Sequence, residues 1–165
     1  MTEAVLGLGS NMGSREKFLS DAINLLSRET GKTVKKSSVW ETEPWGFDAD
    51  ISFYNMAISV RTELEVEHFL RVIHSIEARL GRERYGQGYK SRTIDIDILF
   101  WGDEIITRED IVIPHPHLTG RLFVLAPLNE IAPDFVHPVM KLRVSELLSQ
   151  CADNKRIKCI GPLTV

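Results

Sequence analysis

Two aspartates, Asp95 and Asp97, alternate with isoleucines in the segment RTIDIDILF. On a β-strand, residues two apart face the same side, so the isoleucines can enter a core while both carboxylates project from the opposite face. Their Cβ atoms would lie about 6.6 Å apart, where two unit charges repel by about 2.5 kcal/mol at an effective dielectric of about 20. The pair therefore favours a bound cation, and oxygen ligands in small number suit Mg²⁺ together with substrate phosphates. The alternative is an amphipathic edge strand whose aspartates simply face water.

Four arginines accompany the aspartates. Arg82, Arg84 and Arg92 lie at the ends of the glycine-bearing segment RERYGQGYKSR, and Arg121 follows the PHPHL turn. A guanidinium group matches phosphate oxygens bidentately, so arginines beside paired carboxylates predict a site for a metal-bound polyphosphate. The alternative is that these arginines pair with the protein's own acids.

Two further groups of residues are candidates for ligand binding. Leu70, His74 and Glu77 stand at i, i+4 and i+7 of a predicted helix, and a carboxylate beside its apolar stripe needs either a local arginine or a bound ligand as partner. His115 and His117 form an HxH pair that suggests zinc, but no third ligand stands at a recognisable spacing. We therefore interpret His115 as a hydrogen-bond donor to phosphate or as a turn residue.

The glycine-rich segment GLGSNMG imitates a dinucleotide-binding fingerprint, which would indicate an oxidoreductase. Its pattern is GxGxxxG, however, and the next acidic residue that could bind a ribose, Glu41, follows too late. We interpret Gly7, Gly9 and Gly13 as turn and close-packing glycines. The chain also has no GxxxxGK[ST] phosphate loop.

Hydrophobic periodicity predicts the elements that position these residues. Strands are predicted at 4–8, 34–40, 55–61 and 93–100, and helices at 18–26, 64–80 and 144–150, with Gly81 closing the second helix. The first six elements follow the order β-α-β-β-α-β, which is the split, ferredoxin-like order of an α+β protein. The residues after 100 would form a C-terminal elaboration on this frame. Between the second and third strands lies an aromatic loop, TEPWGFDADIS, whose length favours a role in binding.

The composition limits the classes of function. The chain has 165 residues, of which 43% are hydrophobic and 26% charged, as expected for one globular domain spanning 1–165. A net charge of −3 argues against a nucleic-acid partner. Neither a secretion signal nor an apolar run long enough for a membrane span is recognisable. Cys151 and Cys159 form no metal or redox motif, so we expect a cytoplasmic protein without membrane association.

Several sequence blocks occur together and in order: LGLGSN, YNMA, GRER, SRTIDIDIL, VIPHPHLTGRLFVLAPL and IAPDFVHP. Over nearly the whole chain they resemble the 6-hydroxymethyl-7,8-dihydropterin pyrophosphokinase family of folate biosynthesis. The resemblance implies a ferredoxin-like three-layer α/β/α sandwich, ATP as co-substrate, two Mg²⁺ ions and three mobile loops. It also implies that the pterin hydroxyl attacks the β-phosphorus of ATP, and Asp97 or a metal-bound water would accept its proton. We expect a monomer.

Carried over residue by residue, the resemblance implies three groups of site residues. Asp95 and Asp97 would hold both metal ions, and Arg82, Arg92 and Asp97 would form the catalytic group. The implied ATP-binding residues are Leu70, His74, Glu77, Arg84, Arg92, Ile98, His115 and Arg121. The implied pterin-binding residues are Thr42, Pro44, Trp45, Phe53, Asn55, Asp95 and Phe123, with the pterin stacked between Phe53 and Phe123.

The sequence also departs from the common family pattern. The departures are Glu43, His74, Tyr85, Lys90, Ser91 and Pro116. They concern loop contacts and nucleotide affinity rather than the class of reaction. A competing interpretation is a non-catalytic nucleotide-sensing module, because one fold supports many functions.

Overall fold

The computed structural model describes residues 1–42, 51–82 and 92–164. Outside these ranges lie three predicted site residues, Pro44, Trp45 and Arg84, and four departures from the family pattern, Glu43, Tyr85, Lys90 and Ser91. Most of the predicted aromatic loop also lies outside. No helix in the described ranges is both long and apolar enough to cross a membrane.

The first part of the chain has the predicted β-α-β-β-α-β order. Its elements are β1 (Thr2–Ser10), α1 (Arg15–Glu29), β2 (Lys32–Lys36), β3 (Val39–Thr42), β4 (Phe53–Thr62), α2 (Val66–Arg79) and β5 (Asp95–Trp101). The C-terminal part adds β6 (Ile106–Thr107), β7 (Val112–Ile113), the 3₁₀ turn η1 (Leu118–Gly120), α3 (Leu122–Ile131), α4 (Val144–Gln150) and β8 (Ile157–Gly161). The ferredoxin-like α+β fold with a C-terminal elaboration is therefore confirmed.

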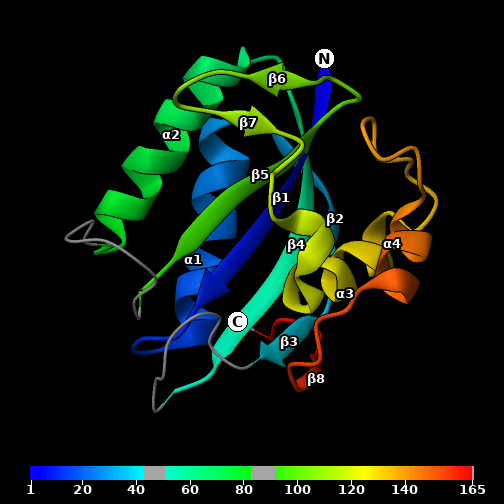
Figure 1. Ribbon diagram of the computed structural model, residues 1–165. Helices are drawn as coiled ribbons and strands as arrows, with labels where there is room; N and C mark the ends of the chain where they lie inside the picture. Colours follow the sequence, from blue (N-terminus) through cyan, green and yellow to red (C-terminus); the bar gives the residue numbers. More distant parts are fainter. Residues whose placement is uncertain (43–50, 83–91, 165) are drawn as a thin grey trace.

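The elements form three layers around one antiparallel sheet (Figure 1). The described strands are ordered β5-β1-β4-β3-β8, and β2 also pairs with β4. Helices α1 and α2 cover one face of the sheet, whereas α3 and α4 cover the other. β1 serves both faces by alternation, because Ala4, Leu6 and Leu8 enter the core under α1 and α2 while Val5 enters the core under α3 and α4.

The helix α2 is held by its apolar stripe. Phe69, Ile73 and Ile76 are all 0% exposed, and burying each such side chain stabilises the fold by about 1.5–3 kcal/mol. Beyond its last turn, Gly81 adopts a φ of 87°, a left-handed conformation that favours glycine. The Arg82 amide donates to the Glu77 carbonyl at 2.9 Å and the Gly81 amide to the Ala78 carbonyl at 3.1 Å. These two bonds form a Schellman motif, so Gly81 ends the helix as predicted.

Two features differ from the predicted elements. The strand predicted at 34–40 is divided into β2 and β3, because Ser37 is buried and exchanges hydrogen bonds with the backbone of Ala57. Its amide donates to the Ala57 carbonyl, and its Oγ accepts from the Ala57 amide. The edge strand β8 and the β6–β7 hairpin were not predicted, because these strands are short and β8 is largely exposed.

Candidate active site

The two aspartates lie on β5 as the alternation predicts. Ile94, Ile96 and Ile98 are at most 6% exposed and belong to the core under α1 and α2. Asp95 and Asp97 therefore face the opposite side, toward α3. After Ile98 the register of β5 against β1 shifts, and Leu99 and Phe100 both enter the second core. The carboxylates stand before this irregularity, in the part of β5 that alternates regularly.

A flat floor lies beside the carboxylates. In the sheet register, Asp97 pairs with Gly7, and Asp95 pairs with Gly9. Because Gly9 in turn pairs with Asn55 on β4, no side chain separates Asp95 from Asn55 on this face. A Cβ atom at Gly9 would lie 2.7 Å from Asn55 Oδ1, so a side chain there would force Asn55 to move. Gly9 is thus a close-packing glycine, as predicted, and it keeps the floor open.

The floor belongs to a recess that is open to solvent. Its lining residues are Gly7, Leu8, Gly9, Asn55, Met56, Asp95, Asp97, Leu99, Phe123 and Val124. β5, β1 and β4 supply the floor and one wall, and the start of α3 supplies the opposite wall. A flat recess with an aromatic side chain, an amide and two carboxylates suits a planar heteroaromatic ligand with polar edges.

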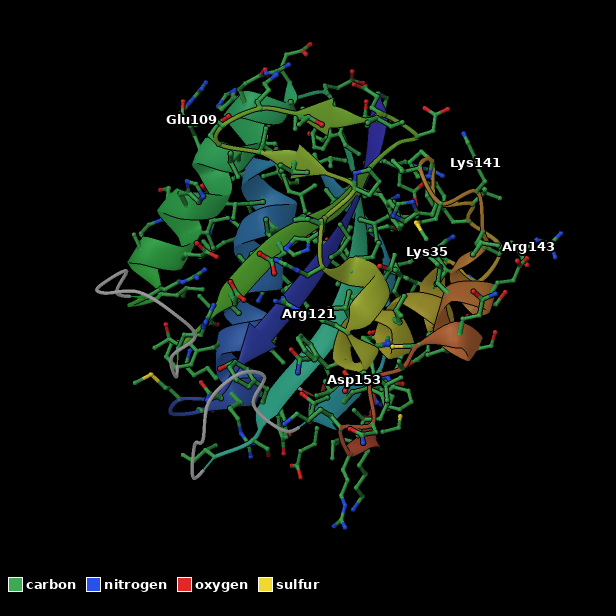
Figure 2. All side chains as sticks on the ribbon, in the orientation of Figure 1. Lys35, Glu109, Arg121, Lys141, Arg143 and Asp153 are labelled. Atoms are coloured by element: carbon green, nitrogen blue, oxygen red, sulfur yellow. The ribbon has the colours of Figure 1, made fainter. Side chains whose placement is uncertain are left out.

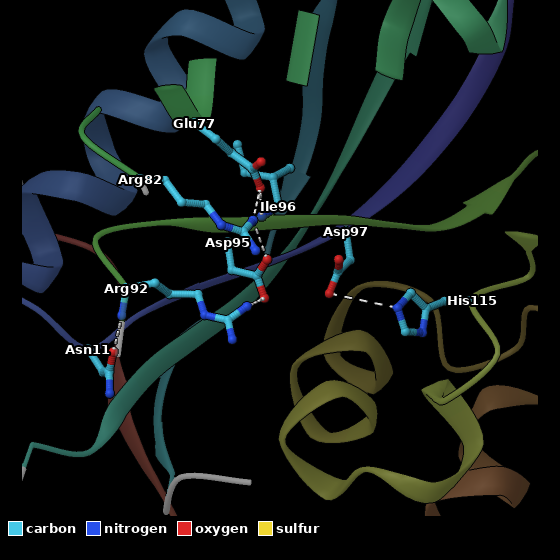
Figure 3. A network of polar contacts seen from close by, with 8 residues as sticks. All are labelled: Asn11, Glu77, Arg82, Arg92, Asp95, Ile96, Asp97 and His115. Carbon is cyan, nitrogen blue, oxygen red and sulfur yellow. Dashed lines mark hydrogen bonds and ion pairs between the residues drawn. The ribbon is translucent and has the colours of Figure 1, made fainter. Parts of the chain in front are cut away.

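Glu77 and Arg82 connect the end of α2 with Asp95 (Figure 3). The Glu77 side chain is 1% exposed, and its Oε1 accepts from Arg82 Nη1 at 2.5 Å and from the Ile96 amide at 2.9 Å. Arg82 Nη1 also donates to Asp95 Oδ1 at 2.7 Å. Burial lowers the pKa of Arg82, but the Asp95 and Glu77 carboxylates outweigh burial and raise it. The buried glutamate therefore binds a local arginine, the first of its two predicted partners.

Arg92 approaches Asp95 from the other side. Its Nη1 lies 3.1 Å from Asp95 Oδ2, so the two oxygens of this carboxylate each have an arginine partner. The backbone of Arg92 pairs with Asn11, which follows directly after β1. The charge of Asp95 is thus balanced by Arg82 and Arg92.

Asp97 has a different electrostatic environment. Although 40% of its side chain is exposed, the surrounding recess removes solvent, and the Asp95 and Glu77 carboxylates add repulsion. Together these causes raise the pKa of Asp97 to about 7, against the opposing charges of Arg82 and Arg121. An additional cation beside Asp97 would relieve this repulsion.

His115 lies opposite Asp97, with 3.8 Å between Nε2 and Asp97 Oδ2 (Figure 3). Burial, followed by the charge of Arg121 and the neighbouring His117, lowers the pKa of His115 to about 4. The ring is therefore neutral at pH 7. Its Nδ1 accepts from the His117 amide at 3.2 Å, so Nε2 carries the proton and is a donor directed into the site.

The donor set of the site suits Mg²⁺ rather than zinc. No three His, Cys, Asp or Glu side chains form a metal-binding cluster within the described ranges. Mg²⁺ is commonly held by only one or two carboxylates, with phosphate and water as its other ligands. Asp95 and Asp97 offer hard oxygen donors and surplus negative charge, so these residues fit Mg²⁺ bound together with a polyphosphate.

On the other side of the floor, Asn55 Nδ2 donates to Thr42 Oγ1 at 2.5 Å, and both residues are buried. Phe53 adjoins this pair, since its Cδ1 would lie 3.7 Å from a Cβ atom at Gly9. Phe123 lines the recess from the start of α3. The structure thus brings these four predicted pterin-binding residues to the same region.

The remaining predicted ATP-binding residues are more dispersed. The Arg121 guanidinium lies 5.7 Å from the centre of the Phe123 ring, and Arg121 is 7% exposed. Figure 2 shows it between α3 and the sheet, whereas Lys141 and Arg143 extend outward. His74 is on the exposed face of α2. Leu70 and Ile98 pack on the core under α1 and α2, on the face of the sheet opposite the recess.

Asn11 was not predicted as a site residue. Its contacts with residues 51 and 92 join positions that lie 40 and 81 residues away in the chain. A local pattern does not reveal such contacts. The available signal was the position of an asparagine immediately after a strand and within the LGLGSN block.

Comparison with known proteins identifies the family of this chain. Residues 5–133 match the family model described as 7,8-dihydro-6-hydroxymethylpterin-pyrophosphokinase (HPPK). The chain is 43% identical over 129 residues to a Bacillus subtilis 2-amino-4-hydroxy-6-hydroxymethyldihydropteridine pyrophosphokinase, covering 78% of this chain and 77% of the relative. It is 42% identical over 137 residues to the Methylorubrum extorquens protein of the same name, covering 82% and 86%.

Longer proteins also contain a matching region. The chain is 41% identical over 154 residues to the folic acid synthesis protein fol1 of Pneumocystis carinii, covering 92% of this chain but only 20% of that protein. A solved structure of Plasmodium falciparum HPPK-DHPS matches with a TM-score of 0.75 and 20% identity, over 91% of this chain and 43% of that chain. This structural likeness supports the fold alone. From its sequence match over most of its length, this chain belongs to the 7,8-dihydro-6-hydroxymethylpterin-pyrophosphokinase family.

Proposed function

We infer that this chain transfers the diphosphate of ATP to the hydroxymethyl group of 6-hydroxymethyl-7,8-dihydropterin, forming AMP and the pterin diphosphate in folate biosynthesis. The observation that carries this inference is the position of Asp95 and Asp97. They stand between two arginines and a flat recess with an aromatic wall. One side of the carboxylates suits a polyphosphate, and the other suits a pterin. Family membership supports the same reaction.

We assign Asp95 and Asp97 to the binding of two Mg²⁺ ions together with ATP. When bound, Mg²⁺ neutralises phosphate charge and makes the phosphorus more susceptible to attack. Arg82 and Arg92 both bind the Asp95 carboxylate, so their guanidinium groups lie beside the proposed metal site. From there both arginines would bind the phosphate oxygens and stabilise the charge that develops during transfer.

Glu77 would act on the nucleotide through Arg82, because its own side chain is buried and bonded to that arginine. His115 would donate a hydrogen bond from Nε2 to a phosphate oxygen, and Arg121 would supply a fixed positive charge. The proposed ATP-binding group also includes Leu70, His74, Arg84, Arg92 and Ile98. Asp97 or a metal-bound water is the proposed acceptor of the hydroxyl proton.

The acceptor would lie on the floor formed by Gly7 and Gly9. Phe123 and Phe53 would contact its faces, and the buried Asn55–Thr42 pair would bind its polar edge. Asp95 also borders this position. Pro44 and Trp45 complete the proposed pterin-binding group. The hydroxymethyl group would thereby approach the metal-bound phosphates.

We also propose that residues 1–165 form a single domain that acts as a cytoplasmic monomer. Its net charge of −3 and its small-molecule site support neither a nucleic-acid partner nor membrane binding. Sedimentation equilibrium with and without ATP would test the monomeric state.

The transfer itself is tested by the fate of the β-phosphorus. ATP labelled at that atom should place the label in the pterin within the first turnover and leave AMP as the nucleotide product. A kinase that transfers the γ-phosphate would instead leave the label in ADP, and this result would refute the proposal. An unmodified pterin in the presence of ATP and Mg²⁺ would favour a nucleotide-sensing module. Asp97→Asn serves as the matched inactive control.

A further inference from the structure

Asn11 is a buried residue placed between the two parts of the site. It is 1% exposed and follows directly after the last residue of β1. Its backbone amide donates to the Arg92 carbonyl at 3.0 Å, and its Oδ1 accepts from the Arg92 amide at 2.7 Å. Both peptide groups around Arg92 are thus fixed by one residue. The Arg92 guanidinium then reaches Asp95 at 3.1 Å.

The same side chain also reaches the segment 51–54. Asn11 Nδ2 donates to the Ile51 carbonyl at 3.4 Å. On the same segment, Arg15 Nη1 donates to the Ser52 carbonyl at 2.8 Å, and its guanidinium lies 3.7 Å from the centre of the Tyr54 ring. Phe53 stands between these two anchored residues. Asn11 therefore contacts both a segment carrying a catalytic arginine and one carrying an acceptor-binding aromatic.

We propose that Asn11 is a positioning residue that holds Arg92 for phosphate transfer and links it to the acceptor-binding segment. This inference rests on the proposed function for the roles of Arg92 and Phe53. An amide side chain meets the requirement because it offers an oxygen acceptor to the Arg92 amide and a nitrogen donor to the Ile51 carbonyl. Without the oxygen, the Arg92 amide loses its partner and its backbone is less restrained.

Substitutions separate the two contacts. Asn11→Ala removes the side-chain bonds to Arg92 and Ile51 and should lower kcat by about 10- to 100-fold, because a small displacement of a catalytic group has an effect of this size. It should also raise the KM for the pterin. Asn11→Asp retains the oxygen that accepts from Arg92 but loses the donor to Ile51, so kcat should stay within about threefold while the pterin KM rises. Arg15→Ala should raise the pterin KM alone.

Thr62→Val is the matched structural control. Thr62 is 2% exposed, and its Oγ1 donates to the Thr30 carbonyl at 2.5 Å. It lies at the end of the β1–β4 pair remote from the site, where Thr62 pairs with Thr2. This variant loses a buried bond of the same kind. Its melting temperature should fall, whereas kcat and both KM values should not change.

Amide hydrogen exchange at Arg92 in the ligand-free protein provides a readout that does not depend on activity. Exchange should be accelerated by Asn11→Ala, but not by Asn11→Asp or Thr62→Val. The proposal is overturned if Asn11→Ala loses stability but keeps kcat and pterin KM, or if Asn11→Asp loses kcat as severely as Asn11→Ala. If the wild-type chain transfers no diphosphate, the proposed function fails, while unchanged exchange at Arg92 would separately refute the structural link.

Discussion

Asp97 should titrate near neutral pH in the ligand-free protein and lose this property when Mg²⁺ binds. Its pKa of about 7 results from burial and from the nearby charges of Asp95 and Glu77. At this pKa the ionised fraction is about 0.1 at pH 6, about 0.5 at pH 7 and about 0.9 at pH 8. Because a carboxylate ligand must be ionised, Mg²⁺ binding should release about 0.9 proton at pH 6 but only about 0.1 at pH 8. The apparent Mg²⁺ affinity should therefore fall about tenfold from pH 8 to pH 6.

The same shift affects stability. A folded-state pKa above the ordinary value of 3.8 means that the folded protein binds this proton more tightly than the unfolded chain. The stability contribution is present below about pH 4 and is lost as the pH rises through about 7. The full shift corresponds to about 4 kcal/mol, but solvent screening of this partly exposed side chain reduces it to about 1 kcal/mol. Asp97→Asn should therefore raise the melting temperature at pH 8 by about 3 °C.

Carbon-13 NMR of the aspartate carboxyl groups measures this titration directly. Asp97→Asn identifies the resonance, and saturating Mg²⁺ should move its midpoint below pH 5. Glu77→Gln should lower the pKa of Asp97 because it removes a repelling charge, whereas Arg82→Ala should raise it because it removes an attracting one. A ligand-free midpoint below pH 5, or no response to either substitution, would refute this account of the charges.

Three further substitutions test the assigned roles. Arg82→Ala should lower kcat in single-turnover experiments by more than it weakens ATP binding, and preserved kcat with lost binding would identify a ground-state anchor instead. Gly9→Ala should raise the pterin KM with little change in ATP affinity, because the added Cβ would lie 2.7 Å from Asn55 Oδ1; an unchanged KM would place the pterin elsewhere. Phe123→Ala should weaken pterin binding by about 1–3 kcal/mol in calorimetry, by analogy with base stacking, and an equal loss for ATP would indicate a packing role.

Local patterns predicted the central part of the fold. The alternation of Asp95 and Asp97 with isoleucines specified both the strand and the face that carries the carboxylates, because burial follows the period of two from Asp95 to Ile98. The apolar stripe of α2 similarly predicted the helix and its glycine end. These features depend on neighbours within a few residues, so the sequence of one segment is enough to predict them.

Other features depend on residues far apart. Asn11 contacts Arg92 only because β1 and β5 are adjacent in the sheet. The open floor requires Gly9 to stand between Asp95 and Asn55. The role of Gly9 can therefore be recognised only when the register of the three strands is known. Buried Ser37 divides a predicted strand through hydrogen bonds with Ala57 on β4. No periodicity within one segment encodes these relations.

The sheet separates two hydrophobic cores, and the two sides of the recess belong to different parts of this structure. One side can therefore be lost while the other stays in place. Asp95 and Asp97 stand on β5, whose isoleucines pack in the core under α1 and α2. Phe123 belongs to α3, whose apolar contacts lie in the core on the opposite face of the sheet. Brief detachment of α3 and α4 would leave the carboxylates on β5 but remove the aromatic wall. Such partial openings are sampled more often than global unfolding. Mild denaturant should therefore weaken pterin binding at lower concentrations than it weakens metal-nucleotide binding, so that acceptor affinity reports how firmly the C-terminal layer is attached.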